Sequence, residues 1–501
     1  MTFIRRNAWN NGGTFDNPDL LWYAKAVAVM KEKHISNPTS WWFYAAIHHE
    51  YLVTPAPPTI SYLNWQQIQS LPQEKLSPVP TQSLQDTFWD QCTHSSWFFL
   101  PWHRGYLVSI EDKLRTIIID LGGPSDWALP YWNYCNVAQN QNHIPPAFLE
   151  ENMPDGLLNP LYVPERYGSD FSNLNEDCQS IPDYDKYGGA SAGTGGILES
   201  NPHGAGHVDI GSQNENRHYG LMAKVPTAGL DPIFYLHHCN IDRMWANWNY
   251  MSESGNTNFT NPTSSSWLDS LGVAKRFAMP MDYEGTQWNY VSDDVTTTTV
   301  NYYTGAYAFT YDDISVASDK AVAAAENAMF VRLQKLNKTV NLDTNLKSSM
   351  QSDNELIGAS LSSLDLAKGK GETKIKLEQK GWNKVEKSLL DATAKKIPDE
   401  VFLQLEGVKS NEEGNSILVY INNQFIERVA LFGIESASSP DGLHGDSGSI
   451  LNINITNFID DLHLDGNFSL DSLDIKIETK YPLHDLADLT IERISIYRAN
   501  H

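Results

Sequence analysis

The spacing of apolar residues changes along this chain from the period of a helix to the period of a strand. Leu107, Ile110 and Leu114 recur at intervals of three and four residues, which predicts a helix that Gly122-Gly123 would end. In residues 473–477 the apolar positions instead alternate with Asp and Lys, which predicts a half-buried strand. A helix period and a strand period predict different secondary structure, so we expect a helical part followed by a β part.

Composition and period together divide the chain into three segments. Residues 1–312 are rich in Trp, Tyr, His, Pro and Asn, and their periodic stretches predict a mainly α domain, a helical bundle with long loops. Residues 313–398 are polar, and we interpret them as a linker region with room for a short helix over 321–335. Residues 399–501 carry several short alternating stretches between turn residues, which predicts a C-terminal β-sandwich.

The charge balance excludes two classes of partner. Lys and Arg number 36 and Asp and Glu 61, so the net charge is −25. Binding to nucleic acid or to an anionic membrane surface requires clustered basic residues, so we expect neither partner. The chain has no apolar run of membrane-spanning length and no apolar signal segment near Met1, which predicts a cytoplasmic protein. The sequence leaves the oligomeric state open.

Histidines cluster in two segments of the helical part. His203 and His207 are four residues apart and would share one face of a helix, which suits two ligands of one metal ion. Pro101 separates His94 from His103, so His94 can lie on the loop before the helix and turn back toward it.

A third histidine can complete each group. His48 or His49 would join the first group, and the adjacent pair His237-His238 would supply the third member of the second. Two trios of imidazoles, without a required carboxylate or thiolate, suit copper, nickel or zinc.

Two long motifs resemble a known family. Residues 94–111, with Phe99-Leu-Pro-Trp-His-Arg104 at their centre, resemble the first copper signature of tyrosinases, catechol oxidases and hemocyanins. Residues 231–242, Asp-Pro-Ile-Phe-Tyr-Leu-His-His-Cys-Asn-Ile-Asp, resemble the second. Arg5-Arg6-Asn7 and Phe309-Thr-Tyr-Asp312 are similar to the opening and closing motifs of this domain, and residues 399–501 are similar, more weakly, to the C-terminal domain of plant polyphenol oxidases. By these motifs the chain is identified as a type-3 copper protein of the polyphenol oxidase family.

The resemblance implies two copper ions and a ligand set. His48 matches the first ligand better than His49, and His238 matches the last ligand better than His237, so His49 and His237 are expected to be structural. The implied ligands are His48, His94 and His103 for copper A and His203, His207 and His238 for copper B. In addition, Cys92-Thr-His94 resembles the fungal arrangement, which implies a thioether bond between Cys92 and the His94 imidazole.

The resemblance also implies an activity. We expect small phenolic substrates and dioxygen as partners, with o-diphenols leaving as o-quinones and dioxygen reduced to water. Glu199 matches a carboxylate that holds a water in plant enzymes, and Val225 matches the gate position, where Val would leave the entrance open. Gly204 stands where efficient hydroxylases of monophenols often carry Asn or Asp, and glycine has no side chain to hydrogen-bond that water. We therefore expect strong oxidation of diphenols and weak hydroxylation of monophenols.

Three alternatives share parts of this pattern. An o-aminophenol oxidase would have the same fold and ligands, a hemocyanin-like protein would bind dioxygen reversibly, and a structural site would hold zinc. Hemocyanins are large assemblies, often of repeated units, whereas this chain has one copper block and no repeat, which favours an enzyme. The resemblance to plant enzymes further implies a latent enzyme whose β domain is a lid, with a cleavage site in residues 341–376 near Lys368 and Lys370.

Overall fold

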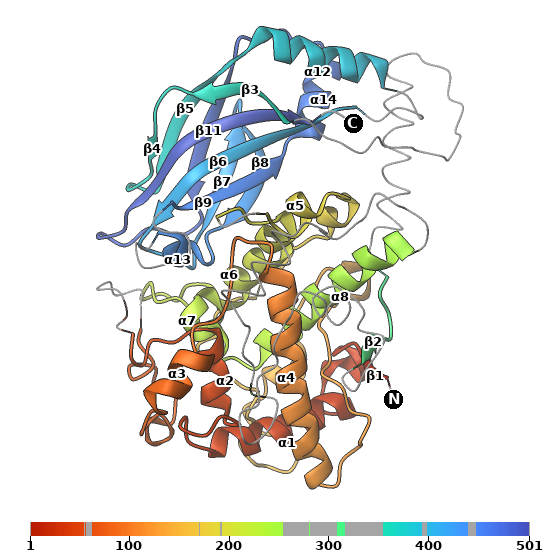
Figure 1. Ribbon diagram of the computed structural model, residues 1–501, viewed down its shortest axis with the longest axis vertical. Helices are drawn as coiled ribbons and strands as arrows, with labels where there is room; N and C mark the ends of the chain where they lie inside the picture. Colours follow the sequence, from red (N-terminus) through yellow and green to blue (C-terminus); the bar gives the residue numbers. More distant parts are fainter. Residues whose placement is uncertain are drawn as a thin grey trace.

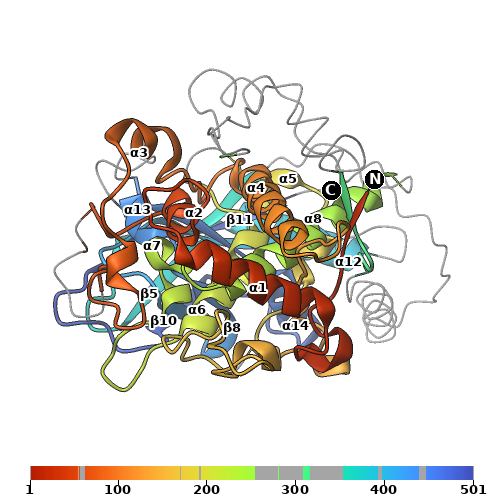
Figure 2. The same ribbon diagram turned by 90° about the horizontal axis from the view of Figure 1, so that it is seen from below.

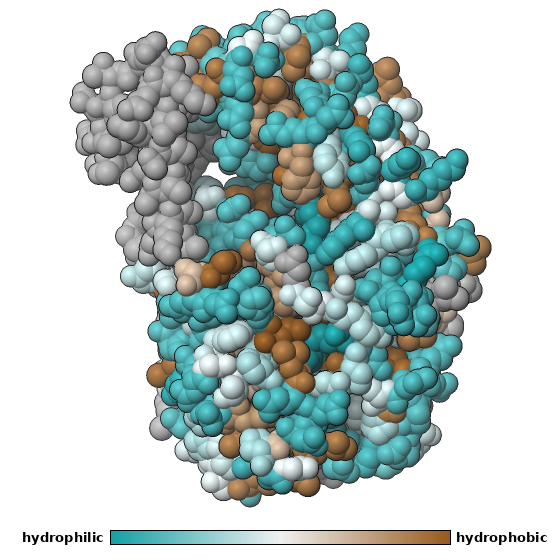
Figure 3. Space-filling model, turned by 180° about the vertical axis from the view of Figure 1, so that it is seen from behind, coloured by the Kyte–Doolittle hydropathy of each residue, from teal (hydrophilic) through white to brown (hydrophobic). Residues whose placement is uncertain are grey.

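The computed structural model has a helical half and a β half that pack against each other (Figure 1). It describes residues 2–54, 56, 63–169, 171–190, 193–253, 280, 308–315, 354–392, 398–438 and 447–499. The face in Figure 3 is mainly hydrophilic with scattered apolar side chains. Within the described ranges, no helix combines the length and the apolar character that crossing a membrane requires.

Four helices form the frame of the helical half: α1 (Pro18–Glu32), α2 (Trp41–His48), α4 (Phe99–Asp120) and α8 (Ile233–Glu253). Each begins or ends where the sequence offers a cap. The Ser40 side chain accepts a hydrogen bond from the amide of Phe43 at the start of α2, and Asp231 does the same for Ile233 at the start of α8. Beyond α4, Gly122 has a φ of +82°, the left-handed conformation that ends many helices. Figure 2 shows α1 and α4 side by side, with the β half behind them.

The remaining elements of this half are short, as the prediction of long loops requires. Between α4 and α6 the chain makes only brief helical turns and α5 among the described residues. The short elements are β1 (Phe3–Arg5), α3 (Gln82–Phe88), α5 (Tyr184–Tyr187), η6 (Glu199–Gly204), α6 (Ala205–Gly211), α7 (Val225–Ala228) and β2 (Phe309–Tyr311).

The two end motifs of the helical half meet. Strand β1 pairs in parallel with β2, with Arg5 opposite Tyr311. The guanidinium of Arg5 is fully buried and binds Glu111 on α4 at 2.7 Å, Asp242 on α8 at 3.2 Å and the Tyr311 hydroxyl at 2.9 Å. Burial of an unpaired charge would be costly, so this arginine holds the two long helices and both ends of the half together.

The β half contains one antiparallel sheet of nine strands, in the order β8-β7-β10-β5-β3-β11-β6-β9 with β4 beside β11. The sheet is strongly curved in Figure 1, and Ile, Leu and Val side chains from its strands join Trp382 of α12 in one core. The predicted fold class, a mainly helical domain followed by a β domain, is confirmed. The elements are β3 (Asn354–Ser360), β4 (Leu364–Asp365), β5 (Lys370–Leu377), α12 (Gln379–Asp391), β6 (Glu400–Ser410), β7 (Ser416–Ile421), β8 (Gln424–Ala430), α13 (Ile434–Ser438), β9 (Ser449–Asn454), α14 (Thr456–Leu464), β10 (Ser472–Thr479) and β11 (Leu489–Ala499).

The predicted linker is wrong over residues 354–391. Strands β3 and β5 lie within the sheet, and Lys368 and Lys370 lie at the turn into β5. The polar sequence misled because β5 alternates exposed and buried positions, and only its last residues turn large apolar side chains inward. The short helix predicted over 321–335 and the segment 341–353 lie outside the described residues.

Buried ion pairs join the two halves. Asp209 on α6 is completely buried and accepts hydrogen bonds from both terminal nitrogens of Arg428 on β8, and from Nζ of Lys480 at 2.8 Å. Paired charges of this kind require a fixed geometry, since a loosened pair would leave Asp209 buried without compensation. The β domain is therefore docked in one orientation on the helical half.

Candidate metal centre

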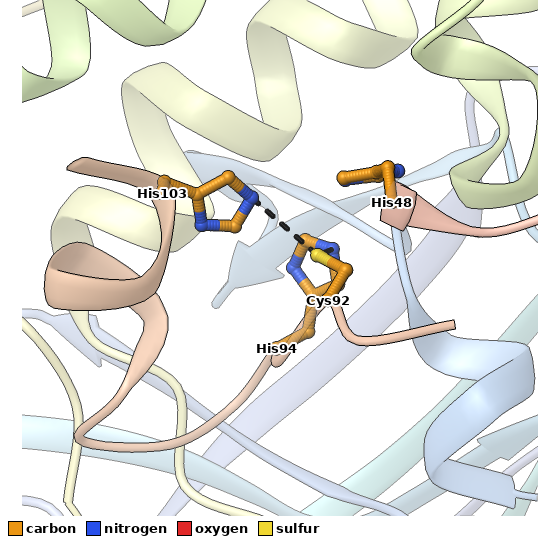
Figure 4. A group of neighbouring side chains, drawn as sticks. All are labelled: His48, Cys92, His94 and His103. Atoms are coloured by element: carbon orange, nitrogen blue, oxygen red, sulfur yellow. Dashed lines mark hydrogen bonds between the residues drawn. The ribbon is translucent and has the colours of Figure 1, made fainter. Parts of the chain in front are cut away.

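The first group of histidines comes from three different elements. His48 ends α2, His94 lies on the loop before α4, and His103 lies in the first turns of α4. Figure 4 shows the three rings around the sulfur of Cys92. In this group, one potential ligand atom from each of the four residues lies within 4.8 Å of the others. The predicted placement of His94 on the loop before the helix is correct.

The second group lies directly beside the first. His203 is in η6, His207 in α6 and His238 in α8, and His237 also lies within the 4.8 Å set. The rings of His103 and His238 are stacked, with centroids 4.3 Å apart and an interplanar angle of 8°. The structure thus brings together all six histidines that the sequence selected as ligands.

Hydrogen bonds hold one nitrogen of most of these rings. The Nδ1 atoms of His48, His103, His203 and His207 donate to the carbonyl oxygens of Val225, Phe99, Glu199 and Met222, at 2.7–3.1 Å. Nδ1 of His94 lies 3.1 Å from a carboxylate oxygen of Glu199. A proton fixed on Nδ1 leaves the lone pair on Nε2, the atom that would bind a metal.

The environment keeps five of these imidazoles neutral. Burial, reinforced by neighbouring imidazoles, lowers the pKa of His48, His103, His203, His207 and His238 well below the usual value. The Nε2 atoms of His48 and His203 are buried and have no hydrogen-bond partner among the described residues. Buried imidazole nitrogens grouped by threes, two of them without a partner among the described residues, fit a pair of copper ions.

His237 is a fourth buried imidazole beside the second group. Neither ring nitrogen has a hydrogen-bond partner among the described residues, and burial lowers its pKa to about 3. Its ring stacks on Tyr134 with centroids 5.5 Å apart, and Gly206 leaves room for it, because a Cβ there would approach the ring to 2.7 Å. These aromatic contacts agree with the structural role expected from the sequence, and that role stays a prediction.

Cys92 points into the first group. Its sulfur lies 3.2 Å from Nε2 of His94 and 3.4 Å from Nε2 of His103, and burial raises the pKa of the thiol. The neutral thiol therefore lies against the His94 ring, where the predicted thioether would form. None of the four cysteines is in a disulfide.

The three residues expected near the substrate lie at the edges of the centre. Glu199 is buried, and one of its carboxylate oxygens accepts the amide of Ser95 at 2.7 Å as well as facing His94, while the other has no partner among the described residues. Val225 is buried, and its backbone carbonyl rather than its side chain provides the contact to His48. Gly204 faces the β domain, because a Cβ there would lie 3.2 Å from the Cβ of Ala430.

The β domain supplies a residue that the sequence did not reveal. Phe432, in the turn between β8 and α13, stacks on His207 with centroids 3.9 Å apart and an interplanar angle of 12°. Its ring also lies 5.3 Å from that of His94 and 5.6 Å from that of His203. A phenylalanine before a turn glycine carries no signal of such a role, because the contact spans the two domains.

Comparison with known families decides the relationship. Residues 38–157 and 162–251 match the common central domain of tyrosinase. The chain carries a tyrosinase-family domain. The tyrosinase family oxidises phenols with a copper pair, and the two histidine groups fit its copper A and copper B, so the chain is an oxidoreductase with two copper ions as cofactors. Residues 353–499 match a domain of unknown function, DUF7868.

The chain is similar to one curated tyrosinase over nearly its whole length, and to plant polyphenol oxidases over about half or less. Tyrosinase HcTyr1 of Hahella sp. is 29% identical over 513 residues, which cover 95% of this chain and 96% of the relative. The chloroplastic polyphenol oxidase of Spinacia oleracea is 30% identical, but the match covers 47% of this chain and 37% of the relative.

Solved structures share the fold of both halves. Latent apple tyrosinase (MdPPO1) matches with a TM-score of 0.56 and 19% identity, over 100% of this chain and 98% of that chain. Latent aurone synthase, a polyphenol oxidase, matches with a TM-score of 0.57 and 16% identity, over 100% of this chain and 90% of that chain. The resemblance of the C-terminal domain to plant enzymes is thus confirmed at the level of the fold.

The ligand assignment predicts two coppers per chain and a difference between adjacent histidines. His203→Ala should lower the copper content from two ions to one, because it removes an Nε2 ligand of copper B. His237→Ala should leave two ions, because it removes only an aromatic contact. Metal analysis of the purified, copper-loaded variants measures both, and loss of a copper from His237→Ala alone would show that the wrong member of the pair was assigned.

Proposed function

We propose that the chain is a latent polyphenol oxidase that oxidises o-diphenols to o-quinones and hydroxylates monophenols only weakly. The observation that carries the proposal is the paired set of buried imidazoles under the Phe432 ring. When bound there, a copper pair would supply the electrons for the reduction of dioxygen. The protein positions the six rings, excludes water from them and offers an aromatic surface on His207 for a phenolic ring.

Oxidation of a monophenol demands one step more than oxidation of a diphenol. A phenolic proton with an unperturbed pKa near 10 must be removed before the ring is hydroxylated. The carboxylate of Glu199 is engaged with His94 and Ser95, although one of its oxygens remains available to a water. Gly204 adds no second hydrogen-bond partner for that water. We therefore expect monophenols to reach the metal centre without efficient removal of their phenolic proton.

The lid is the second part of the proposal. The Phe432 ring covers His207, and Gly204 lies against Ala430, so a planar phenol cannot stack on the same imidazole while the β domain is docked. The latent state named for the apple tyrosinase and the aurone synthase is consistent with this arrangement, since both share the fold over the full chain. The cleavage site expected around Lys368 and Lys370 is not retained, because a cut there would fall in the turn between β4 and β5, two strands of the same sheet, and not between the two domains.

Oxygen uptake tests the substrate class. We expect faster uptake with catechol than with 2-aminophenol or tyramine, and a lag with tyramine. Equal or faster turnover of 2-aminophenol would assign the chain to the o-aminophenol oxidases, and reversible oxygen binding without turnover of catechol would contradict an enzymatic role.

Removing the Phe432 ring should activate the full-length enzyme. A stacked aromatic contact contributes about 0.5–1.5 kcal/mol beyond its buried area, so Phe432→Ala should raise the rate of catechol oxidation by up to about tenfold. Phe425→Ala is the matched control, because Phe425 lies on β8 and is half exposed away from the rings. Initial rates with catechol compare the two, and an equal rise in both variants, or none, would contradict the lid.

Gly204→Asn should raise the ratio of tyramine hydroxylation to dopamine oxidation. One added hydrogen bond to a water contributes about 0.5–1.5 kcal/mol, which corresponds to about a twofold to tenfold change. The new side chain would also press on Ala430 and could displace the lid. A displaced lid should raise both rates equally, so the ratio of the two rates reports only the effect on removal of the phenolic proton. Gly204→Ala, which crowds Ala430 without adding a polar group, is the control, and an unchanged ratio in Gly204→Asn would refute this role of position 204.

A further inference from the structure

A buried glutamate of the β domain reaches the backbone that orients ligands of both metal sites. Glu413 lies in the loop between β6 and β7 and is 1% exposed. One carboxylate oxygen accepts the amide of Val225 at 2.8 Å, and the other accepts the amide of Gly433 at 3.2 Å. Each oxygen therefore binds a different part of the molecule.

The first contact leads to the ligands. The carbonyl oxygen of Val225 accepts the Nδ1 hydrogen of His48 at 3.0 Å, and that of Met222, three residues earlier, accepts the Nδ1 hydrogen of His207 at 2.8 Å. Nζ of Lys224, between them, donates to the backbone carbonyl of Glu413 at 3.3 Å. Residues 222–225 thus hold one imidazole of each histidine group and are themselves held by the loop that carries Glu413.

The second contact leads to the lid. Gly433 follows Phe432, has a φ of +79°, and lies so close to His94 that a Cβ on it would approach the ring to 3.3 Å. The amide of Gly433 is held by Glu413, so the same carboxylate that steadies residues 222–225 also fixes the turn that presents Phe432 to His207.

We infer that Glu413 is a positioning residue that couples the docked lid to the orientation of His48 and His207. The inference deepens the proposed lid and rests on that part of the proposed function. With the β domain docked, Glu413 fixes residues 222–225 and thereby keeps the two Nε2 atoms directed at their metal ions. The β domain then stabilises the metal centre as well as covering it.

Copper release from the full chain tests the inference without any substrate. Loss of a group that orients a metal-binding histidine typically weakens metal affinity about tenfold to a hundredfold. Glu413→Ala, loaded with two coppers and mixed with an excess of a chelator, should therefore release copper at least about tenfold faster than the wild type. Glu413→Gln keeps an oxygen that can accept the Val225 amide, so its release rate should lie between those of the wild type and Glu413→Ala.

Glu412→Ala is the matched control. Glu412 is equally buried in the same loop and also crosses to the helical half, where it accepts the Tyr219 hydroxyl at 3.0 Å, but it touches neither Val225 nor Gly433 in the described structure. Both alanine variants should lower the midpoint of thermal unfolding, whereas only Glu413→Ala should accelerate copper release. Wild-type release from Glu413→Ala, or equal acceleration in both variants, would overturn the inference.

The outcome is separable from that of the proposed function. Copper release is measured without phenol or turnover, so a wrong substrate class leaves it unchanged. If Phe432→Ala failed to activate the enzyme while Glu413→Ala still released copper faster, the lid would be refuted, and Glu413 would position residues 222–225 without coupling them to a lid. If Phe432→Ala activated the enzyme and Glu413→Ala released copper at the wild-type rate, the positioning role of Glu413 would be refuted and the lid would stand.

Discussion

The structure is built around the need to bury six imidazoles while leaving one nitrogen of each for a metal. A buried ring nitrogen that carries a proton must find an acceptor, and His48, His103, His203 and His207 find backbone carbonyls. Phe99, Glu199 and Val225 are the first residues of α4, η6 and α7, and Met222 lies in a short turn, so the acceptors come from the first turns of helices and from turns. This requirement explains why long irregular segments lie beside the rings, and why the rigid helices α2, α4 and α8 surround them.

The sequence predicted the parts of this arrangement that depend on local order. The copper motifs placed the histidines on the correct elements, because the stretches around α4 and α8 keep a fixed spacing and clear start and stop signals. The end motifs were also informative, since Arg5 and Tyr311 meet across β1 and β2. The choice of His48 over His49 and of His238 over His237 as ligands came from the family resemblance. The structure by itself does not exclude His237, because it also places that residue in the second group.

The failures of prediction have physical causes. Strands β3 and β5 resemble a linker in sequence because much of their surface faces solvent and carries polar side chains. The roles of Phe432 and Glu413 could not be predicted from the sequence, because both depend on contacts with residues about two hundred positions away. Val225 shows a further limit: its identity suggested a side-chain role, whereas the structure shows a backbone contact that any residue except proline, which lacks the amide, could make.

In the proposed lid, the stacking of Phe432 on His207 makes inhibition a matter of effective concentration. A ring held by its own chain competes with free phenols as if it were present at a millimolar level or above, whatever the dilution of the protein. A higher concentration of phenol therefore displaces the Phe432 ring only to a small extent. Any event that loosens the β domain from the helical half lowers the effective concentration of the ring directly. Under the proposed lid, the threshold for activity depends more on the docking of the β domain than on the supply of phenol.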